Sequence, residues 1–142
     1  MSFDRLMQSF ANQQALGELE IRDDRYYFTI DTNMDVACFQ ANGKFYVYGV
    51  ISMLPKDHQK RETFLLDMLQ KNLALMMTER VSLCIEPEED VLAIYLCRPL
   101  QGLNASEIEK SVATLVNNLE LLIQLAHSDP LSKPSPPSLL MP

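Results

Sequence analysis

The sequence has no tryptophan and only four glycines and two histidines among its 142 residues. The glycines stand apart from one another, and no Gly-x-x-x-x-Gly-Lys sequence occurs, which excludes the usual phosphate-binding loop. His58 and His127 have no other metal ligand at the spacings of common zinc sites. We therefore expect neither a nucleotide nor a metal cofactor.

Cysteine is also scarce, and Cys38, Cys84 and Cys97 are too far apart for a Cys-x-x-Cys site. Their odd number, without a secretory leader at the amino terminus, argues against a disulfide framework and favours a reducing cytoplasm. All three lie in apolar segments, whereas a nucleophilic cysteine needs an accessible, electropositive pocket. We expect that the protein is not an enzyme.

Long apolar runs and basic residues are lacking too. No run approaches the roughly 20 apolar residues that a membrane helix needs. Lys and Arg number 12 against 19 Asp and Glu, so the net charge is −7 and the pI is near 4.7. Such a field repels phosphate backbones and anionic lipid headgroups, so we expect neither nucleic-acid binding nor membrane insertion.

Two groups of acidic residues are better explained as turns than as sites. Residues 86–90, Glu-Pro-Glu-Glu-Asp, lack the ligand spacing of an EF-hand loop and suit the tip of a hairpin. Asp31 and Asp35 bracket a turn sequence, where Asp supports the local backbone and is not needed as a carboxylate pair for catalysis.

Apolar residues are abundant, at 47% of the chain, and their periodicity changes along it. Spacings of three and four predict helices, and alternating, β-branched or aromatic segments predict strands. Gly17 is expected to end the first helix. The predicted helices cover residues 3–16, 64–76 and 104–127, and the predicted strands cover residues 25–30, 36–40, 44–51, 81–85 and 91–97.

These elements predict one α+β domain over residues 1–127, with a twisted antiparallel sheet because the connections are short. A Pro/Ser-rich flexible tail is expected over residues 128–142. Strand 91–97 has apolar residues on both of its faces. Together with the first helix and the Met-rich second helix, it holds more apolar surface than one small core is expected to use. The sequence therefore predicts a binding protein, and the wide stripe of the second helix indicates a dimer.

The order helix, three strands, helix, two strands, helix resembles the class I type III secretion chaperones, the Tir-chaperone-like family. Further resemblance lies in Gly17, in the strand Gly43-Lys-Phe-Tyr-Val-Tyr-Gly49 and in Leu65-Leu-Asp-Met-Leu-Gln-Lys-Asn72 of the second helix. The resemblance implies a homodimer in the bacterial cytoplasm that binds the amino-terminal segment of one or more effector proteins in extended form. It also implies that a separate secretion ATPase is a further partner.

The resemblance also gives site residues. It implies client contact at Phe3, Leu6 and Phe10 of the first helix and at Leu92, Ile94 and Leu96 of strand 91–97, with Val91, Ala93 and Tyr95 as the alternative face of that strand. It implies a dimer interface at Leu65, Leu69 and Met76. A regulatory or heterodimeric module that binds a transcription factor or a secretion-apparatus subunit is the alternative function.

Overall fold

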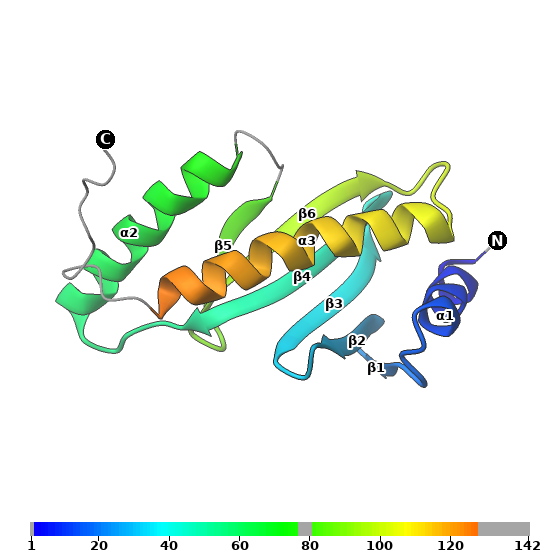
Figure 1. Ribbon diagram of the computed structural model, residues 1–142, viewed down its shortest axis with the longest axis horizontal. Coiled ribbons are helices and arrows are strands. Elements are labelled where there is room, and N and C mark those ends of the chain that lie inside the picture. The colour runs from blue at the N-terminus through cyan, green and yellow to red at the C-terminus, as the bar shows by residue number, and fades with distance from the viewer. Residues whose placement is uncertain (1, 77–80, 128–142) are drawn as a thin grey trace.

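The computed structural model describes residues 2–76 and 81–127, so the predicted tail at 128–142 lies outside the described residues. The chain forms three helices and one sheet within these ranges (Figure 1). In chain order the elements are α1 (Phe3–Gln13), β1 (Glu20–Arg22), β2 (Arg25–Ile30), β3 (Met34–Ala41), β4 (Lys44–Met53), α2 (His58–Met76), β5 (Ser82–Glu86), β6 (Val91–Pro99) and α3 (Ala105–Ala126). The predicted class and element order are confirmed, and β1 is a short strand that the periodicity did not predict.

The sheet is antiparallel throughout, with the strand order β1-β2-β3-β4-β6-β5. Tight hairpins join the first four strands, with two-residue turns at β1–β2 and β3–β4 and a three-residue turn, residues 31–33, at β2–β3. Each turn has two consecutive residues with positive φ, which is typical of type I′ turns. These pairs are Asp23-Asp24, Asp31-Thr32 and Asn42-Gly43. After β4 the chain crosses through α2 to the sheet edge, and β6 returns between β5 and β4.

The helix ends are set by side-chain and backbone caps. Asn104 Oδ1 accepts a hydrogen bond of 2.9 Å from the Glu107 N–H and so caps the start of α3. The end of α1 differs from the prediction. It stops at Gln13, and Ala15 takes the left-handed conformation with φ 55°, because the Leu16 N–H bonds back to the Ala11 carbonyl at 3.0 Å. Gly17 lies beyond this cap.

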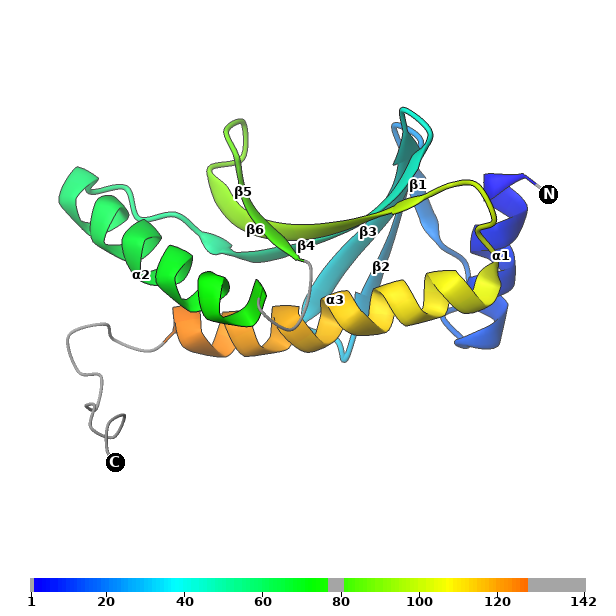
Figure 2. The same cartoon turned by 90° about the horizontal axis from the view of Figure 1, so that it is seen from above.

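Helix α3 lies along one face of the sheet, with α1 and α2 towards its two ends (Figure 2). The core fills the space between the helices and the sheet, where Phe3 contacts Phe45 and Phe10 contacts Phe28 at ring-centroid distances of 5.9 and 5.6 Å. Gly49 of β4 brings the strand close to α3, since an added Cβ would lie 2.7 Å from Leu119 Cδ2. No described helix covers the opposite, concave face of the sheet (Figure 2).

Candidate functional site

The described residues carry no constellation that suits catalysis. They contain no group of three or more His, Cys, Asp or Glu placed to hold a metal ion, and no helix long and apolar enough to span a bilayer. Burial raises the pKa of the Cys38 thiol well above its ordinary value. Burial, followed by the nearby Glu86 carboxylate, also raises the pKa of Cys84. Both thiols therefore stay protonated at neutral pH and are poor nucleophiles. The candidate sites are surfaces for binding.

The first surface is an exposed apolar stripe on α2, which we call the α2 stripe. It consists of Leu66, Leu69 and Leu73, whose relative exposures are 62%, 54% and 67%. The spacing of three and four residues places these side chains on one face of the helix. Their exposure is unusual, because neighbouring α2 residues such as Met68 are completely buried against the rest of the chain. The α2 stripe is thus left without a partner among the described residues.

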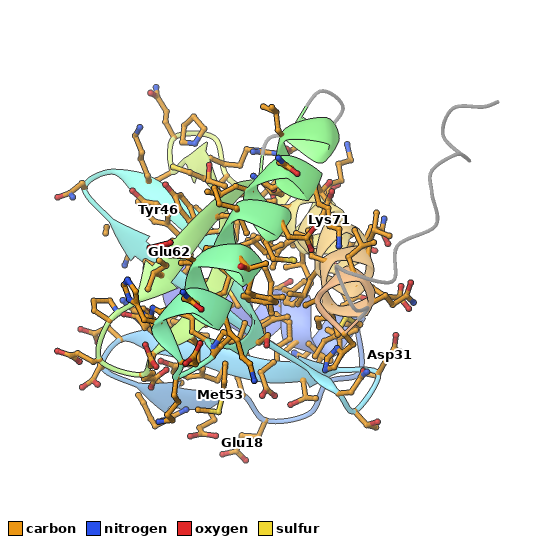
Figure 3. The ribbon with its side chains drawn as sticks, turned by 90° about the vertical axis from the view of Figure 1, so that its left-hand side faces the viewer. Glu18, Asp31, Tyr46, Met53, Glu62 and Lys71 are labelled. Atoms are coloured by element: carbon orange, nitrogen blue, oxygen red, sulfur yellow. The ribbon has the colours of Figure 1, made fainter. Side chains whose placement is uncertain are left out.

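Polar contacts fix the position of α2 and leave the α2 stripe facing outward. Arg61 forms an ion pair of 2.7 Å with Asp90, next to the start of β6. Lys71 forms an ion pair of 2.7 Å with Asp67 and donates to the Leu125 carbonyl of α3 at 3.4 Å. Figure 3 faces α2 and shows Lys71 on the side towards α3. The helix is therefore anchored to both β6 and α3.

The second surface is a groove between α1 and α3, which we call the α1–α3 groove. It has a volume of about 420 Å³ and is lined by Phe10 and Leu16 on one side and Val112 and Val116 on the other. Gln14 donates to Glu109 Oε2 at 3.1 Å across it. The groove is a partly apolar depression with polar groups at its rim, the form expected of a site for a peptide side chain.

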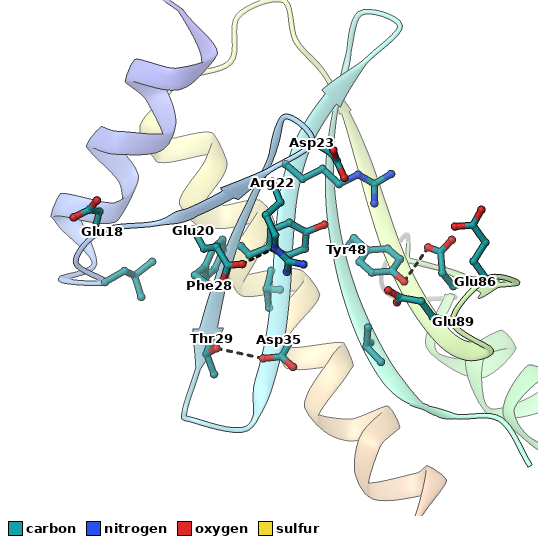
Figure 4. A pocket seen from close by; sticks show the side chains of 16 residues that line it. Glu18, Glu20, Arg22, Asp23, Phe28, Thr29, Asp35, Tyr48, Glu86 and Glu89 are labelled. Carbon is teal, nitrogen blue, oxygen red and sulfur yellow. Dashed lines mark hydrogen bonds and ion pairs between the residues drawn. The ribbon is translucent and has the colours of Figure 1, made fainter.

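The third surface is the concave hollow on the sheet face that α3 does not cover. It has a volume of about 930 Å³, and its walls are β1 with the β1–β2 turn on one side and the β5–β6 turn on the other (Figure 4). The Tyr48 hydroxyl donates to Glu86 Oε2 at 3.2 Å (Figure 4). Burial and then the Glu86 carboxylate raise the pKa of Tyr48. The carboxylates that line the hollow are Glu18, Glu20, Asp23, Asp35, Glu86, Glu88 and Glu89.

The structure places the predicted client-contact residues in the core. Their side chains are all buried, so the prediction of surplus apolar surface on α1 and on strand 91–97 is wrong. The reason is that α1 packs against α3 and the sheet, and β6 is an interior strand. In the alternative set Val91 and Ala93 are buried and Tyr95 is half-buried. The buried client-contact residues are Phe3, Leu6, Phe10, Leu92, Ile94 and Leu96. Phe10 also lines the α1–α3 groove.

The predicted dimer residues are divided by the structure. Leu69 belongs to the α2 stripe, whereas Leu65 is half-buried and packs against the core. Met76 ends α2, and its side chain lies outside the described part of the chain. The sequence periodicity did not single out Leu73 as exposed, because its spacing also fits the buried face. The pattern Leu66, Leu69, Leu73 is the signal that identifies a second stripe.

Comparison with known proteins decides the class of this protein. The model of the Tir chaperone protein (CesT) family matches residues 5–122, which is most of the chain. The chain belongs to the Tir chaperone protein family. This is a family of type III secretion chaperones that bind other proteins and are not enzymes, so the predicted family and non-enzymatic class are confirmed. No curated protein matches the sequence.

Three solved structures, two of which contain a named chaperone, share the fold of this family member. A chain of the HopA1–SchA chaperone–effector complex matches with a TM-score of 0.62 at 14% identity, over 86% of this chain and 93% of that one. A chain from the Yersinia pestis type III secretion chaperone SycH in complex with a stable fragment of YscM2 matches with a TM-score of 0.59 at 18% identity, over 85% and 99%. A chain of the ExsC–ExsE complex matches with a TM-score of 0.68 at 13% identity, over 87% and 92%.

Proposed function

We propose that this chaperone forms a homodimer through the α2 stripe and binds an amino-terminal segment of one or more effector proteins in extended form. The family assignment supports the class of function. The observation that carries the proposal is the exposure of Leu66, Leu69 and Leu73 on one face of a helix that is otherwise anchored to the fold. The clients would be held in the bacterial cytoplasm and passed to the secretion ATPase.

The size of the α2 stripe suits the centre of a two-fold interface. Burying the exposed part of one leucine contributes roughly 1 to 2 kcal/mol, so the six leucines of two copies contribute about 6 to 12 kcal/mol. Association costs about 4 to 15 kcal/mol in lost freedom. The stripe is therefore comparable with this cost but does not greatly exceed it, and losing two of its leucines should abolish the dimer.

The client-binding part of the proposal rests on the sheet edges and the α1–α3 groove. β1 and β5 are the edge strands, and each pairs with only one neighbour among the described strands. Ile21 of β1 and Ile85 of β5 are exposed, with relative exposures of 49% and 44%. An extended client can add backbone hydrogen bonds at such an edge and place alternate apolar side chains in a nearby depression. In the groove the half-buried Leu16 and Val116 would make this apolar contact, and Phe10, which also lines the groove but is 1% exposed, would support them from below.

The other predicted client residues take a supporting role in this proposal. Phe3 and Leu6 hold α1 against the core, and Leu92, Ile94 and Leu96 hold β6 beneath α3, so all five fix the surface that a client would meet. Because the client becomes ordered only on binding, it can cover a large area while its ordering entropy limits the affinity. Release for secretion then needs no energy source within the chaperone.

The dimer is tested by the double substitution Leu69→Asp/Leu73→Asp, with Leu121→Asp on α3 as the control. Leu121 is also exposed, at 39%, but lies outside the α2 stripe. Light scattering after size exclusion should give the mass of two chains for the wild type and the control. It should give one chain, with unchanged far-ultraviolet circular dichroism, for the double variant. A wild-type protein that is one chain at micromolar concentration would refute the homodimer.

The client is tested by co-expression with effectors encoded beside the chaperone gene. We expect a stable complex of two chaperone chains and one effector, and deletion of the effector's amino-terminal segment should prevent capture. Capture that survives this deletion would overturn the proposed segment. Recovery of a transcription factor or a secretion-apparatus subunit, with no effector, would favour the alternative regulatory function.

A further inference from the structure

The concave hollow carries a disproportionate part of the protein's charge. Seven carboxylates and two guanidinium groups line it, which gives a net formal charge of −5, whereas the whole sequence has −7. The side chains that line the hollow are drawn in Figure 4, and Figure 2 shows α3 on the other side of the sheet from its concave face. A concentration of one sign of charge in a concave surface focuses the field there and selects partners of the opposite sign.

The two cationic side chains of the hollow are already engaged. Arg22 forms an ion pair of 2.5 Å with Glu20, and its guanidinium carbon lies 4.2 Å from the centre of the Tyr27 ring. The guanidinium carbon of Arg25 lies 4.2 Å from the centre of the Phe39 ring. Of the seven carboxylates, only Glu20 forms an ion pair with any residue that the structure describes. Glu86 and Asp35 each accept one hydrogen bond, from Tyr48 and Thr29, but these two carboxylates and the remaining four have no cationic partner among the described residues.

The hollow also offers apolar surface next to its carboxylates. The rings of Tyr27 and Tyr48 and the side chain of Val50 line it, and the hydrogen bond from Tyr48 to Glu86 fixes one ring beside a carboxylate. Lysine and arginine side chains match such a surface, because their methylene stems pack on apolar groups while their charged ends reach carboxylates. The Tyr27 ring already accepts this kind of contact from Arg22 within the chain, whereas no described guanidinium lies over the Tyr48 ring.

We infer that the concave hollow binds a segment of the client that carries lysine or arginine side chains, with their stems on Tyr48 and Val50 and their charged ends among the surrounding carboxylates. This inference rests on the proposed function, which it extends from extended segments in general to cationic ones. A nucleic-acid partner is disfavoured by the sign of the charge, since phosphates would be repelled.

The test uses the intact chaperone and a fluorescent peptide in which lysine and alanine alternate. A fluorescent peptide in which glutamate and alanine alternate is the negative control. Fluorescence anisotropy should show binding of the lysine peptide alone, and weaker binding at higher salt. The variant Glu88→Gln/Glu89→Gln removes two carboxylates at the tip of the β5–β6 turn. We expect it to raise Kd about fivefold, which corresponds to roughly 1 kcal/mol.

The variant Asp23→Asn/Asp35→Asn changes the opposite side of the hollow and should raise Kd in the same direction. The matched control, Glu107→Gln/Glu120→Gln, removes the same charge from exposed positions of α3 and should leave Kd within about twofold of the wild type. Equal weakening by the control would show that only the overall charge matters, and an unchanged Kd in both hollow variants would also overturn the inference. Failure of the proposed function is separate, because it appears as a wild-type chaperone that captures no effector in co-expression.

Discussion

The close approach of β4 to α3 gives a quantitative prediction for Gly49→Ala. An added Cβ would lie 2.7 Å from Leu119 Cδ2 and 3.3 Å from Leu115 Cδ2, whereas carbon atoms pack best at about 3.5 to 4.0 Å. Both leucines are completely buried, so neither can move into solvent. Overpacking of this kind costs about 1 to 3 kcal/mol, and removing glycine's chain flexibility offsets roughly 0.5 to 1 kcal/mol of it. We expect a net loss of about 1 to 2 kcal/mol.

The assay is urea unfolding followed by circular dichroism at one fixed protein concentration, because association would otherwise change the midpoint. Leu119→Ala alone should cost about 2 to 5 kcal/mol. Combined with Gly49→Ala it should cost less than the sum, by about 1 kcal/mol or more, since the truncated side chain makes room for the new methyl group. Leu122→Ala, which is equally buried on the same helix, is the additive control. A stable Gly49→Ala protein whose effect adds to that of Leu119→Ala would refute the steric argument.

Three further substitutions test local features of the fold. Thr32→Gly and Ala15→Gly should each stabilise the protein by about 0.5 to 1 kcal/mol, because a side chain at φ 63° or 55° is strained, and an unchanged urea midpoint would contradict this. Tyr26→Phe should cost about 1 kcal/mol at neutral pH, since it removes a 2.8 Å hydrogen bond to Asp4. Burial and then this bond raise the pKa of Tyr26 from 10.0 to about 12, so the wild type should lose stability as the pH rises between these values, because the phenol of the unfolded chain ionises first. Tyr26→Phe has no phenol to ionise, so the difference between its urea midpoint and that of the wild type should shrink from pH 10 to pH 12. A difference that stays constant over this range would refute the role given to the Tyr26 hydroxyl.

Exposure on α2 shows where sequence patterns reach their limit. Leu65 and Leu69 both fit the predicted apolar face, yet Leu65 packs on the core and Leu69 is exposed. A helix with apolar residues on more than half of its circumference has no unique buried side until its neighbours are placed. The anchoring contacts Arg61–Asp90 and Lys71 to Leu125, which fix that side, join residues 29 and 54 positions apart in the sequence.

The same limit explains the buried client candidates and the concave hollow. Strand 91–97 was correctly expected to have two apolar faces, but its place between β4 and β5 depends on a crossover that no local pattern encodes. The hollow brings together carboxylates from β1, β3 and the β5–β6 turn, which the sequence shows only as separate turn residues.

The periodicity and turn residues of the sequence determined the α+β class, the order of the main elements and the family, because these depend on contacts between residues near one another in the chain. Only the tertiary structure decided which apolar residues stay exposed and where the negative charge gathers. Those properties depend on how distant segments pack, and packing consumes most of the apolar surface that the sequence offers.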